Sequence, residues 1–210
     1  MKGRSTIALA KGLKARAEEG RVYAIDPQED EAFREFAANL ERAGVSQLVE
    51  PIRATSQDAA RKTDLEGIDV LFIDGSHEYE SVLQDVLEWT PRLDAGGVVG
   101  FNDPFWPGVS QALLEKVAWS GSPFRDPAFA DNTLFFRYHP EAHPRRPDAW
   151  LVGRLRLFLR LGQAWHRYLG IVSSKTRLPY FVRWILLRPP LAVVRRILPL
   201  LLLHGTRRAS

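Results

Sequence analysis

The feature that most constrains the fold is an apolar run at residues 68–73, which ends abruptly in Asp74 and Gly75. Its length and β-branched residues predict a strand that is buried on both faces of a parallel sheet. Ligand sites of such sheets lie at the carboxyl ends of the strands. Asp74 is therefore expected at the mouth of a crevice, with His77 in the following turn. Together they could hold a metal ion and move a proton; the plainer interpretation is an Asp-Gly turn beside a solvated histidine.

Hydrophobic periodicity along the first 140 residues alternates between that of strands and that of helices. It predicts strands at residues 21–26, 48–54, 68–74, 96–103 and 133–138. It predicts helices within residues 1–20 (capped by Ser5 or Thr6), at 31–43, after a cap at 55–58, at 79–89 and at 109–119. Strands that alternate with helices indicate an α/β fold with a mostly parallel sheet and flanking helices.

Acidic residues end three of these strands, at Asp26, Asp74 and Asp103. In a parallel sheet the carboxyl ends of the strands meet at one edge, so the three side chains are expected to lie near one another. One acidic strand end is common, but three at one edge predict a ligand site.

The charges divide the chain into two parts. The last acidic residue is Asp148, and 12 Arg and Lys residues follow it, so residues 1–150 carry 17 basic and 25 acidic side chains. The chain has no cysteine, which excludes disulfides and thiolate metal sites. We predict an α/β domain at residues 1–139, a Pro-rich linker at 140–149 and a basic amphipathic tail at 150–210.

The tail begins with the periodicity of an amphipathic helix, at residues 150–169. One predicted face carries Arg156, Arg160, Gln163 and Arg167, and the other carries Leu151, Leu155, Phe158, Trp165 and Leu169. The longest apolar run of the tail, residues 197–203, is far shorter than the roughly 20 residues that span a bilayer.

Three partners fit this tail. Arginines beside Trp, Phe and Leu are typical of a segment that lies on an anionic membrane. Packing on the domain or on a second copy, in a homo-oligomer, is the structural alternative. Nucleic acid is disfavoured, because residues 1–150 are acidic. No signal-peptide core follows Met1, so we expect a cytoplasmic protein, with attachment to the inner face of the membrane if the first interpretation holds.

Several motifs together resemble a known family. Gly3-x-Ser5-Thr6 comes first, and the strand before Asp26-Pro27 follows. Residues 73–79 read Ile-Asp-Gly-Ser-His-Glu-Tyr, and residues 93–103 read Leu-x-x-Gly-Gly-Val-Val-x-Phe-x-Asp, with Asp85 and Trp89 between them. Over about residues 1–138 the chain is similar to class I S-adenosylmethionine-dependent methyltransferases, in the subgroup of macrocin-type sugar O-methyltransferases and cephalosporin hydroxylase-like proteins. The resemblance implies a Rossmann-like sheet.

The resemblance implies a role for each matching position. For S-adenosyl-L-methionine it implies that the loop with Gly3, Ser5 and Thr6 lies beside the methionine part and that Asp26 binds the ribose hydroxyls. It also implies that Ser56 and Gln57 lie near the adenine, and that the strand-end carboxylate of Asp74 is a further cofactor residue. For Mg²⁺ or another divalent cation it implies the ligands Asp74, Asn102 and Asp103. For catalysis it implies His77 as the general base, and catechol-type O-methyltransferases likewise place their base three residues after the metal aspartate.

The implied reaction is O-methylation of a hydroxyl on a sugar or a natural-product-like small molecule. An alcohol is a poor nucleophile until its proton is removed. The metal ion would bind and orient the acceptor oxygens, and His77 would take the proton.

Two positions depart from the family pattern. Asn102-Asp103 stands where relatives often have two acids, which implies weaker metal binding. The family's first strand should precede Gly3, where only Met1 and Lys2 stand, so we expect a misplaced start or a fragment. Three other classes compete: a non-catalytic relic of the fold in a membrane-associated or complex-associated protein, metal-assisted hydrolysis, and a nucleotide-binding oxidoreductase, which the absent Gly-rich loop disfavours.

Overall fold

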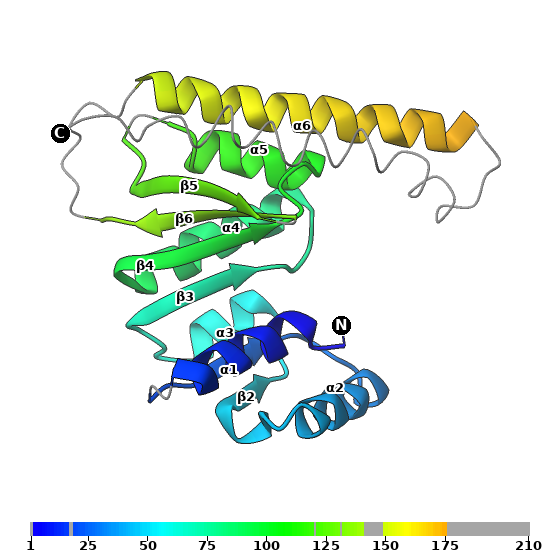
Figure 1. The fold of residues 1–210 in the computed structure, drawn as a ribbon, viewed down its shortest axis with the longest axis vertical. Coiled ribbons are helices and arrows are strands. Elements are labelled where there is room, and N and C mark those ends of the chain that lie inside the picture. The colour runs from blue at the N-terminus through cyan, green and yellow to red at the C-terminus, as the bar shows by residue number, and fades with distance from the viewer. Residues whose placement is uncertain (1, 17–18, 120, 131, 141–148, 176–210) are drawn as a thin grey trace. The chain divides into compact units, whose positions relative to one another are not determined.

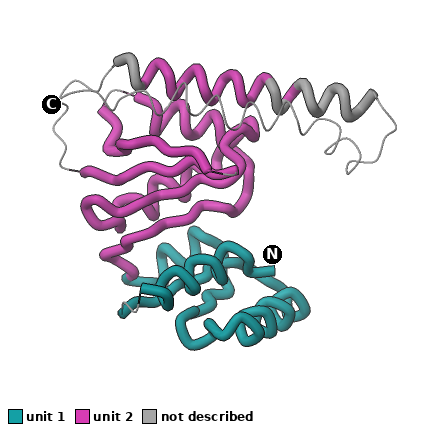
Figure 2. Tube along the Cα trace, in the orientation of Figure 1, with its two compact units in different colours: residues 1–64 teal, residues 65–210 magenta. Residues whose placement is uncertain are grey.

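The computed structural model describes residues 2–16, 19–119, 121–130, 132–140 and 149–175. The chain divides into two compact units, residues 1–64 and residues 65–210 (Figure 2). Most of the predicted linker, and the predicted tail beyond residue 175, lie outside the described residues.

Unit 1 contains a two-stranded parallel sheet with helices around it (Figure 1). Its elements are α1 (Arg4–Arg16), β1 (Val22–Ile25), α2 (Asp30–Arg42), the 3-10 helix η1 (Ser46–Leu48), β2 (Val49–Ile52) and α3 (Ser56–Lys62). Val22 lies opposite Val49 in the sheet. Phe36 and Leu40, one helical turn apart on α2, pack with Ala10, Val45 and Val49 in the core of this unit.

Two caps in unit 1 show how local sequence sets the helix boundaries. Thr55 caps α3, because its Oγ1 accepts a hydrogen bond from the Asp58 backbone N–H at 3.1 Å, as predicted. Helix α1 already begins at Arg4, so Ser5 and Thr6 lie in its first turn and neither is the cap. The residue before the helix, Gly3, has a φ of +78°.

Unit 2 contains a four-stranded sheet in the order β3-β4-β6-β5. Its elements are β3 (Ile68–Ile73), α4 (Tyr79–Trp89), the 3-10 helix η2 (Thr90–Arg92), β4 (Leu93–Asn102), α5 (Pro107–Lys116), β5 (Phe124–Ala130), β6 (Thr133–Tyr138) and α6 (Ala149–Lys175). Strands β3 and β4 are parallel, whereas β6 runs antiparallel to both β4 and β5. The mixed α/β class is confirmed, and the antiparallel strands lie at one side of the sheet.

Strand β3 differs from its prediction in one respect. Its bounds agree, but it lies at the edge of the four-stranded sheet, and the side chain of Val70 is 49% exposed. Among the described strands β3 pairs with β4 alone. The expectation of a strand buried on both faces was therefore wrong for β3 in unit 2.

Strand β5 was missed by the sequence analysis. Its sequence contains Asp126-Pro127, and the register against β6 shifts between Arg125 and Ala128. A proline within a strand interrupts both the hydrogen-bond ladder and the alternation of side chains, so the pattern does not indicate a strand.

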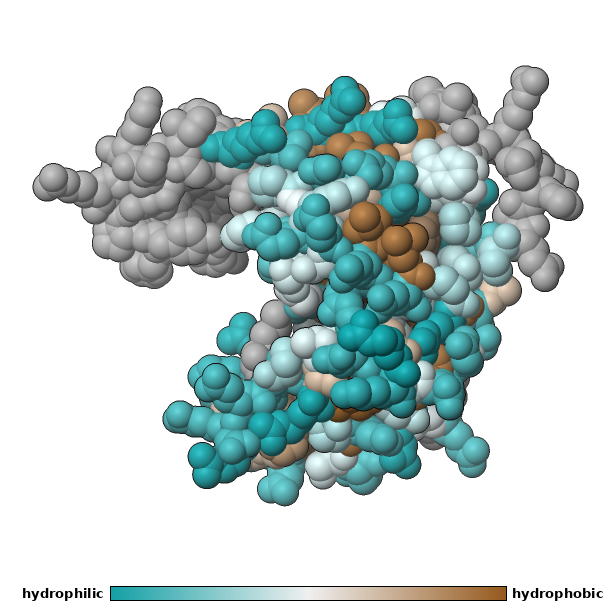
Figure 3. Space-filling view, turned by 180° about the vertical axis from the view of Figure 1, so that it is seen from behind, coloured by the Kyte–Doolittle hydropathy of each residue, from teal (hydrophilic) through white to brown (hydrophobic). Residues whose placement is uncertain are grey.

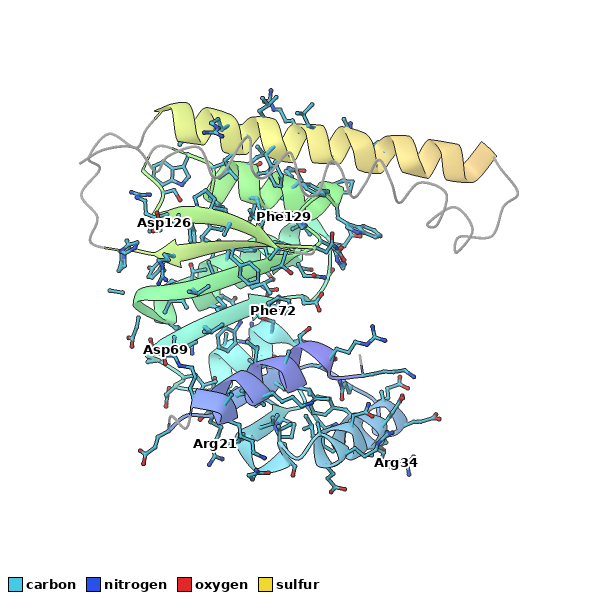
Figure 4. The ribbon with its side chains drawn as sticks, in the orientation of Figure 1. Arg21, Arg34, Asp69, Phe72, Asp126 and Phe129 are labelled. Carbon is cyan, nitrogen blue, oxygen red and sulfur yellow. The ribbon has the colours of Figure 1, made fainter. Side chains whose placement is uncertain are left out.

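Helix α6 confirms the predicted amphipathic helix and extends it to Lys175. It packs along α5 (Figure 1) and contributes Leu155, Phe158 and Leu159 to the core of unit 2. The Phe158 ring lies 5.3 Å from the ring of Phe129, which is labelled in Figure 4. Packing on the domain is thus what the described part of α6 shows. None of the described helices is both long and apolar enough to span a membrane.

Candidate functional site

The candidate site lies at the carboxyl ends of β3 and β4. Ile73 lies opposite Phe101 in the parallel register, so Asp74 and Asn102 follow side by side. Asn102 Nδ2 donates a hydrogen bond to Asp74 Oδ1 at 2.7 Å and a longer one to Asp103 Oδ2 at 3.2 Å. The prediction that these two strand ends bring Asp74, Asn102 and Asp103 together is confirmed.

His77 joins this cluster through its side chain. His77 Nε2 lies 3.1 Å from Asp103 Oδ2, and the two side chains are 28% and 26% exposed. A carboxylate accepts a hydrogen bond and cannot donate one, so this contact is made when Nε2 carries the proton. Nδ1 is then the basic nitrogen of the neutral ring, and the side chain is still reached by solvent.

Two residues near the start of α5 fix the loop that carries His77. The Trp106 ring lies 4.8 Å from the His77 ring at a tilt of 40°. Gly108 approaches the loop so closely that a Cβ atom there would lie 2.3 Å from the His77 carbonyl oxygen. Only glycine allows this contact, and it places the first turn of α5 directly against the His77 backbone.

Asp103 is the most constrained residue of the site. Its φ of +49° lies in the left-handed region, which aspartate tolerates better than most residues. Its backbone N–H donates to the Asn132 carbonyl oxygen at 2.9 Å, and Asn132 Nδ2 donates to Asp103 Oδ1. Asn132 therefore holds both the backbone and the side chain of Asp103.

Asn132 was not predicted as a site residue. It precedes Thr133, which lies opposite Asn102 in the antiparallel β4–β6 register. The only sequence signal was an asparagine immediately before a predicted strand, and such residues are common in turns.

The surroundings of the Asp74 carboxyl disfavour its charged form. Burial raises its pKa above the ordinary value, and the negative charge of Asp103 acts in the same direction. The hydrogen bond from Asn102 opposes this shift by stabilising the charged form.

The predicted magnesium site does not fit this arrangement. Asn102 turns its N–H donors toward both carboxylates, while its Oδ1 faces Thr133 Oγ1 at 3.4 Å. A divalent cation at that point would meet donors where it needs oxygen ligands. The described part of the chain also holds no group of three or more His, Cys, Asp or Glu side chains that could bind a metal.

The predicted cofactor residues other than Asp74 lie in unit 1. Asp26 follows β1, and its Oδ2 accepts a hydrogen bond from Gln28 Nε2 at 3.1 Å. A carboxylate at the end of a parallel strand suits the ribose hydroxyls of a nucleoside. Because Asp74 and Asp103 belong to unit 2, the predicted common edge of all three acids stays a prediction.

The remaining predicted cofactor residues lie at two helix starts of unit 1. Ser5 and Thr6 are in the first turn of α1, and Ser56 and Gln57 begin α3. Gly3 has a packing reason for its identity, because a Cβ atom there would lie 2.7 Å from the Phe36 ring. Their cofactor roles stay predictions.

Comparisons with known proteins agree with this architecture. Residues 1–104 match the methyltransferase domain family. The matched segment of this chain includes Asp26, Asp74, His77, Asn102 and Asp103. A search of curated proteins found no match.

Solved structures show a fold similar to that of this chain. The cofactor-bound Rv0187 from MTB is 18% identical at a TM-score of 0.53, over 65% of this chain and 68% of that chain. The O-methyltransferase NovP is 16% identical at a TM-score of 0.53, over 66% of this chain and 68% of that chain. The O-methyltransferase TomG from Streptomyces achromogenes, in complex with SAM, is 18% identical at a TM-score of 0.50, over 66% of this chain and 69% of that chain. The Rossmann-like fold is confirmed.

Proposed function

We propose that the chain transfers a methyl group from S-adenosylmethionine to a hydroxyl of a small molecule, of the sugar or natural-product type. The observation that carries the proposal is the contact between His77 Nε2 and Asp103 Oδ2, at the carboxyl ends of two parallel strands. The match of residues 1–104 to the methyltransferase domain supports the same reaction class. NovP and TomG are both described as O-methyltransferases, which supports oxygen as the acceptor atom.

His77 acts as the general base in this proposal. Its Nε2–H is held by Asp103, so Nδ1 accepts the proton of the acceptor hydroxyl. The Asp103 carboxylate stabilises the positive charge that then develops on the imidazole ring. Asn102 and Asn132 both donate to Asp103 and keep its oxygens in place. The Trp106 ring, which lies against the His77 ring at a tilt of 40°, limits the rotation of the base.

The unit 1 residues would hold the cofactor. Asp26 would accept hydrogen bonds from the ribose hydroxyls, Ser5 and Thr6 would lie beside the methionine part, and Ser56 and Gln57 beside the adenine. S-adenosylmethionine, when bound, supplies a methyl group on a positively charged sulfur. No metal ion is included in the proposal, because Asn102 directs its N–H donors at the two carboxylates.

Two measurements test the function. Titration calorimetry of the chain with S-adenosylmethionine should show binding in the micromolar range, as for typical enzyme cofactors and substrates. A panel of sugars, phenols and other hydroxylated natural products should then yield S-adenosylhomocysteine, measured by mass spectrometry. Binding without turnover on any hydroxylated acceptor, together with methylation of amines or thiols, would contradict the proposal. If the coding sequence continues upstream of Met1, the longer product serves as a second sample.

The role of a metal ion has its own test. We expect turnover to change less than about twofold between 5 mM EDTA and 5 mM Mg²⁺, because the proposal includes no metal ion. A catalytic Mg²⁺ would be worth several kcal/mol, so its removal would lower turnover far more than twofold. A large loss in EDTA that Mg²⁺ restores would show that Asn102 turns its amide over in the working enzyme.

A further inference from the structure

Helix α6 has an exposed face that its packing on the domain leaves open. Leu155, Phe158, Leu159 and Gly162 are buried, whereas the opposite side exposes Gly153, Arg156, Leu157, Arg160, Leu161, Ala164 and Arg167. The buried side fixes the rotation of the helix, because a Cβ atom on Gly162 would lie 2.1 Å from the Phe105 ring. The exposed face is therefore a fixed surface of the domain.

The exposed face is itself divided lengthwise. At 3.6 residues per turn, Arg156, Arg160 and Arg167 lie along one side of it, and Leu157 and Leu161 lie along the other. The two leucines are one turn apart and are 48% and 45% exposed. Figure 3 shows hydrophilic and hydrophobic side chains next to each other over α6, and Figure 4 shows nitrogen-bearing side chains on its outer side.

The charge of this helix is of one sign. α6 carries five Arg and Lys residues and no Asp or Glu. Arg156 Nε donates to the Ala118 carbonyl oxygen at 2.8 Å, whereas neither Arg160 nor Arg167 has an acidic partner among the described residues. The sequence after α6 adds seven basic residues and no acidic one, while residues 1–150 have an excess of eight acidic side chains.

We propose that the exposed face of α6 lies on an anionic lipid surface, with Leu157 and Leu161 among the upper acyl chains and Arg160 and Arg167 at the phosphates. A helix that lies in the membrane interface needs both an apolar strip and adjacent cations, and this face provides both. Long arginine side chains reach the headgroups while their stems stay in apolar surroundings. Affinity for nucleic acid comes from basic residues at the phosphates, so two exposed leucines beside the arginines would not contribute to it.

The structure corrects which residues could enter the membrane. The apolar side predicted from the sequence includes Leu155 and Phe158, and both are now buried in the core of unit 2. Among the leucines of α6 whose exposure the structure describes, Leu157 and Leu161, on the opposite side, are the exposed ones. Residues 1–150 have an excess of acidic side chains, which the same lipids would repel, so the attraction is expected to come from the basic residues after position 150.

Vesicle sedimentation of the full chain tests the proposal without cofactor or acceptor. We expect binding to vesicles of 30% phosphatidylglycerol in phosphatidylcholine, weak binding to pure phosphatidylcholine, and a decrease as salt screens the arginines. The double variant Leu157→Gln/Leu161→Gln should bind about tenfold more weakly, since it removes the inserted apolar area. The Arg160→Glu/Arg167→Glu variant should bind at least about 25-fold more weakly, because each basic residue near the surface contributes about fivefold to the affinity.

Two matched substitutions control for general effects. Leu87→Gln removes a leucine that is 55% exposed on α4, and Arg34→Glu reverses an exposed charge on α2 (labelled in Figure 4). Both should bind vesicles like the wild type, and circular dichroism should show that all variants fold. Wild-type binding by the Leu157→Gln/Leu161→Gln variant would overturn the proposal. So would equal binding to neutral vesicles, or an arginine-dependent affinity for oligonucleotides in the absence of vesicle binding.

Discussion

Asp26 and Asp103 have the same sequence signature and different surroundings. Each follows an apolar strand, and Gln28, two residues away in the same loop, donates a hydrogen bond to the Asp26 carboxylate. The Asp103 side chain is contacted from three places in the sequence: His77 after β3, Asn102 at the end of β4, and Asn132 before β6. An acidic strand end can thus be the centre of a network that joins several elements.

This difference suggests different tasks for the two acids. A carboxylate at the end of a parallel strand, such as Asp26, can accept hydrogen bonds from the ribose hydroxyls of a nucleoside. A carboxylate held from several elements has a fixed position, which is what a catalytic base needs from the group that orients it. The comparison therefore assigns binding to Asp26 and positioning to Asp103, and variants on each side can separate the two.

The largest effect is expected for His77→Ala. General-base catalysis contributes about 10²- to 10⁴-fold, so kcat should fall by that factor while the affinity for S-adenosylmethionine stays within about twofold. Stopped turnover assays and calorimetry measure the two quantities. His139→Ala, a histidine at the far end of β6, serves as the control and should retain full turnover. Full activity in the His77→Ala variant would remove His77 from the mechanism.

Asp26→Asn should affect binding and spare the chemical step. Loss of hydrogen bonds to a charged group costs about 1.5–3 kcal/mol, so the Kd for S-adenosylmethionine should rise about 10- to 100-fold. At saturating cofactor, kcat should change less than about threefold. The control is Asp30→Asn, because Asp30 is a nearby acid whose Oδ1 pairs with Arg53 at 2.8 Å. An unchanged Kd would show that Asp26 does not contact the ribose.

Asn132→Ala should show the opposite division between binding and turnover. Without its amide, Asp103 Oδ1 loses a donor and the His77 ring loses part of its orientation. We expect kcat to fall about tenfold, the magnitude of one lost hydrogen bond to a charged group, with little change in KM. Asn39→Ala removes a comparable amide that donates to the Lys2 carbonyl oxygen at 2.9 Å, and it should be neutral. A rise in KM with unchanged kcat would contradict a positioning role.

Much of this site could be predicted from the sequence because parallel strands share an edge. Helix α4 has the predicted bounds, and Asp74, His77, Asn102 and Asp103 do come together. These relations depend only on strand ends and on short loops, which residue periodicity defines.

The remaining features depend on pairing and orientation, which periodicity does not define. Asn132 reaches Asp103 from 29 positions away, through the antiparallel strand β6. The metal ligands were implied by the resemblance, which matches residue types, and an amide has a donor side and an acceptor side that the sequence does not distinguish. The sequence also does not show which leucines of α6 packing buries, because Leu155 and Leu159 lie in the core whereas Leu157 and Leu161 are exposed.

The smallest effect is expected for the stability of Asp74→Asn. Burial raises the pKa of Asp74 in the folded state, so the folded protein holds this proton more tightly than the unfolded chain does. The wild type therefore loses stability as the pH rises from the ordinary aspartate pKa, about 4, through the raised value. Asparagine cannot ionise, and its Oδ1 can still accept the hydrogen bond that Asn102 gives to Asp74 Oδ1.

Thermal unfolding at several pH values checks this expectation. The Asp74→Asn variant should have a Tm higher than the wild type by a few degrees at most at pH 7, and this advantage should disappear near pH 4. Asp69→Asn, which removes an equal charge from an exposed position of β3 (Figure 4), controls for the change in net charge. A variant less stable than the wild type at pH 7 would mean that the Asp74 charge contributes more through its partners than its burial costs. The charged form of Asp74 would then stabilise the folded state through Asn102, which also donates to Asp103.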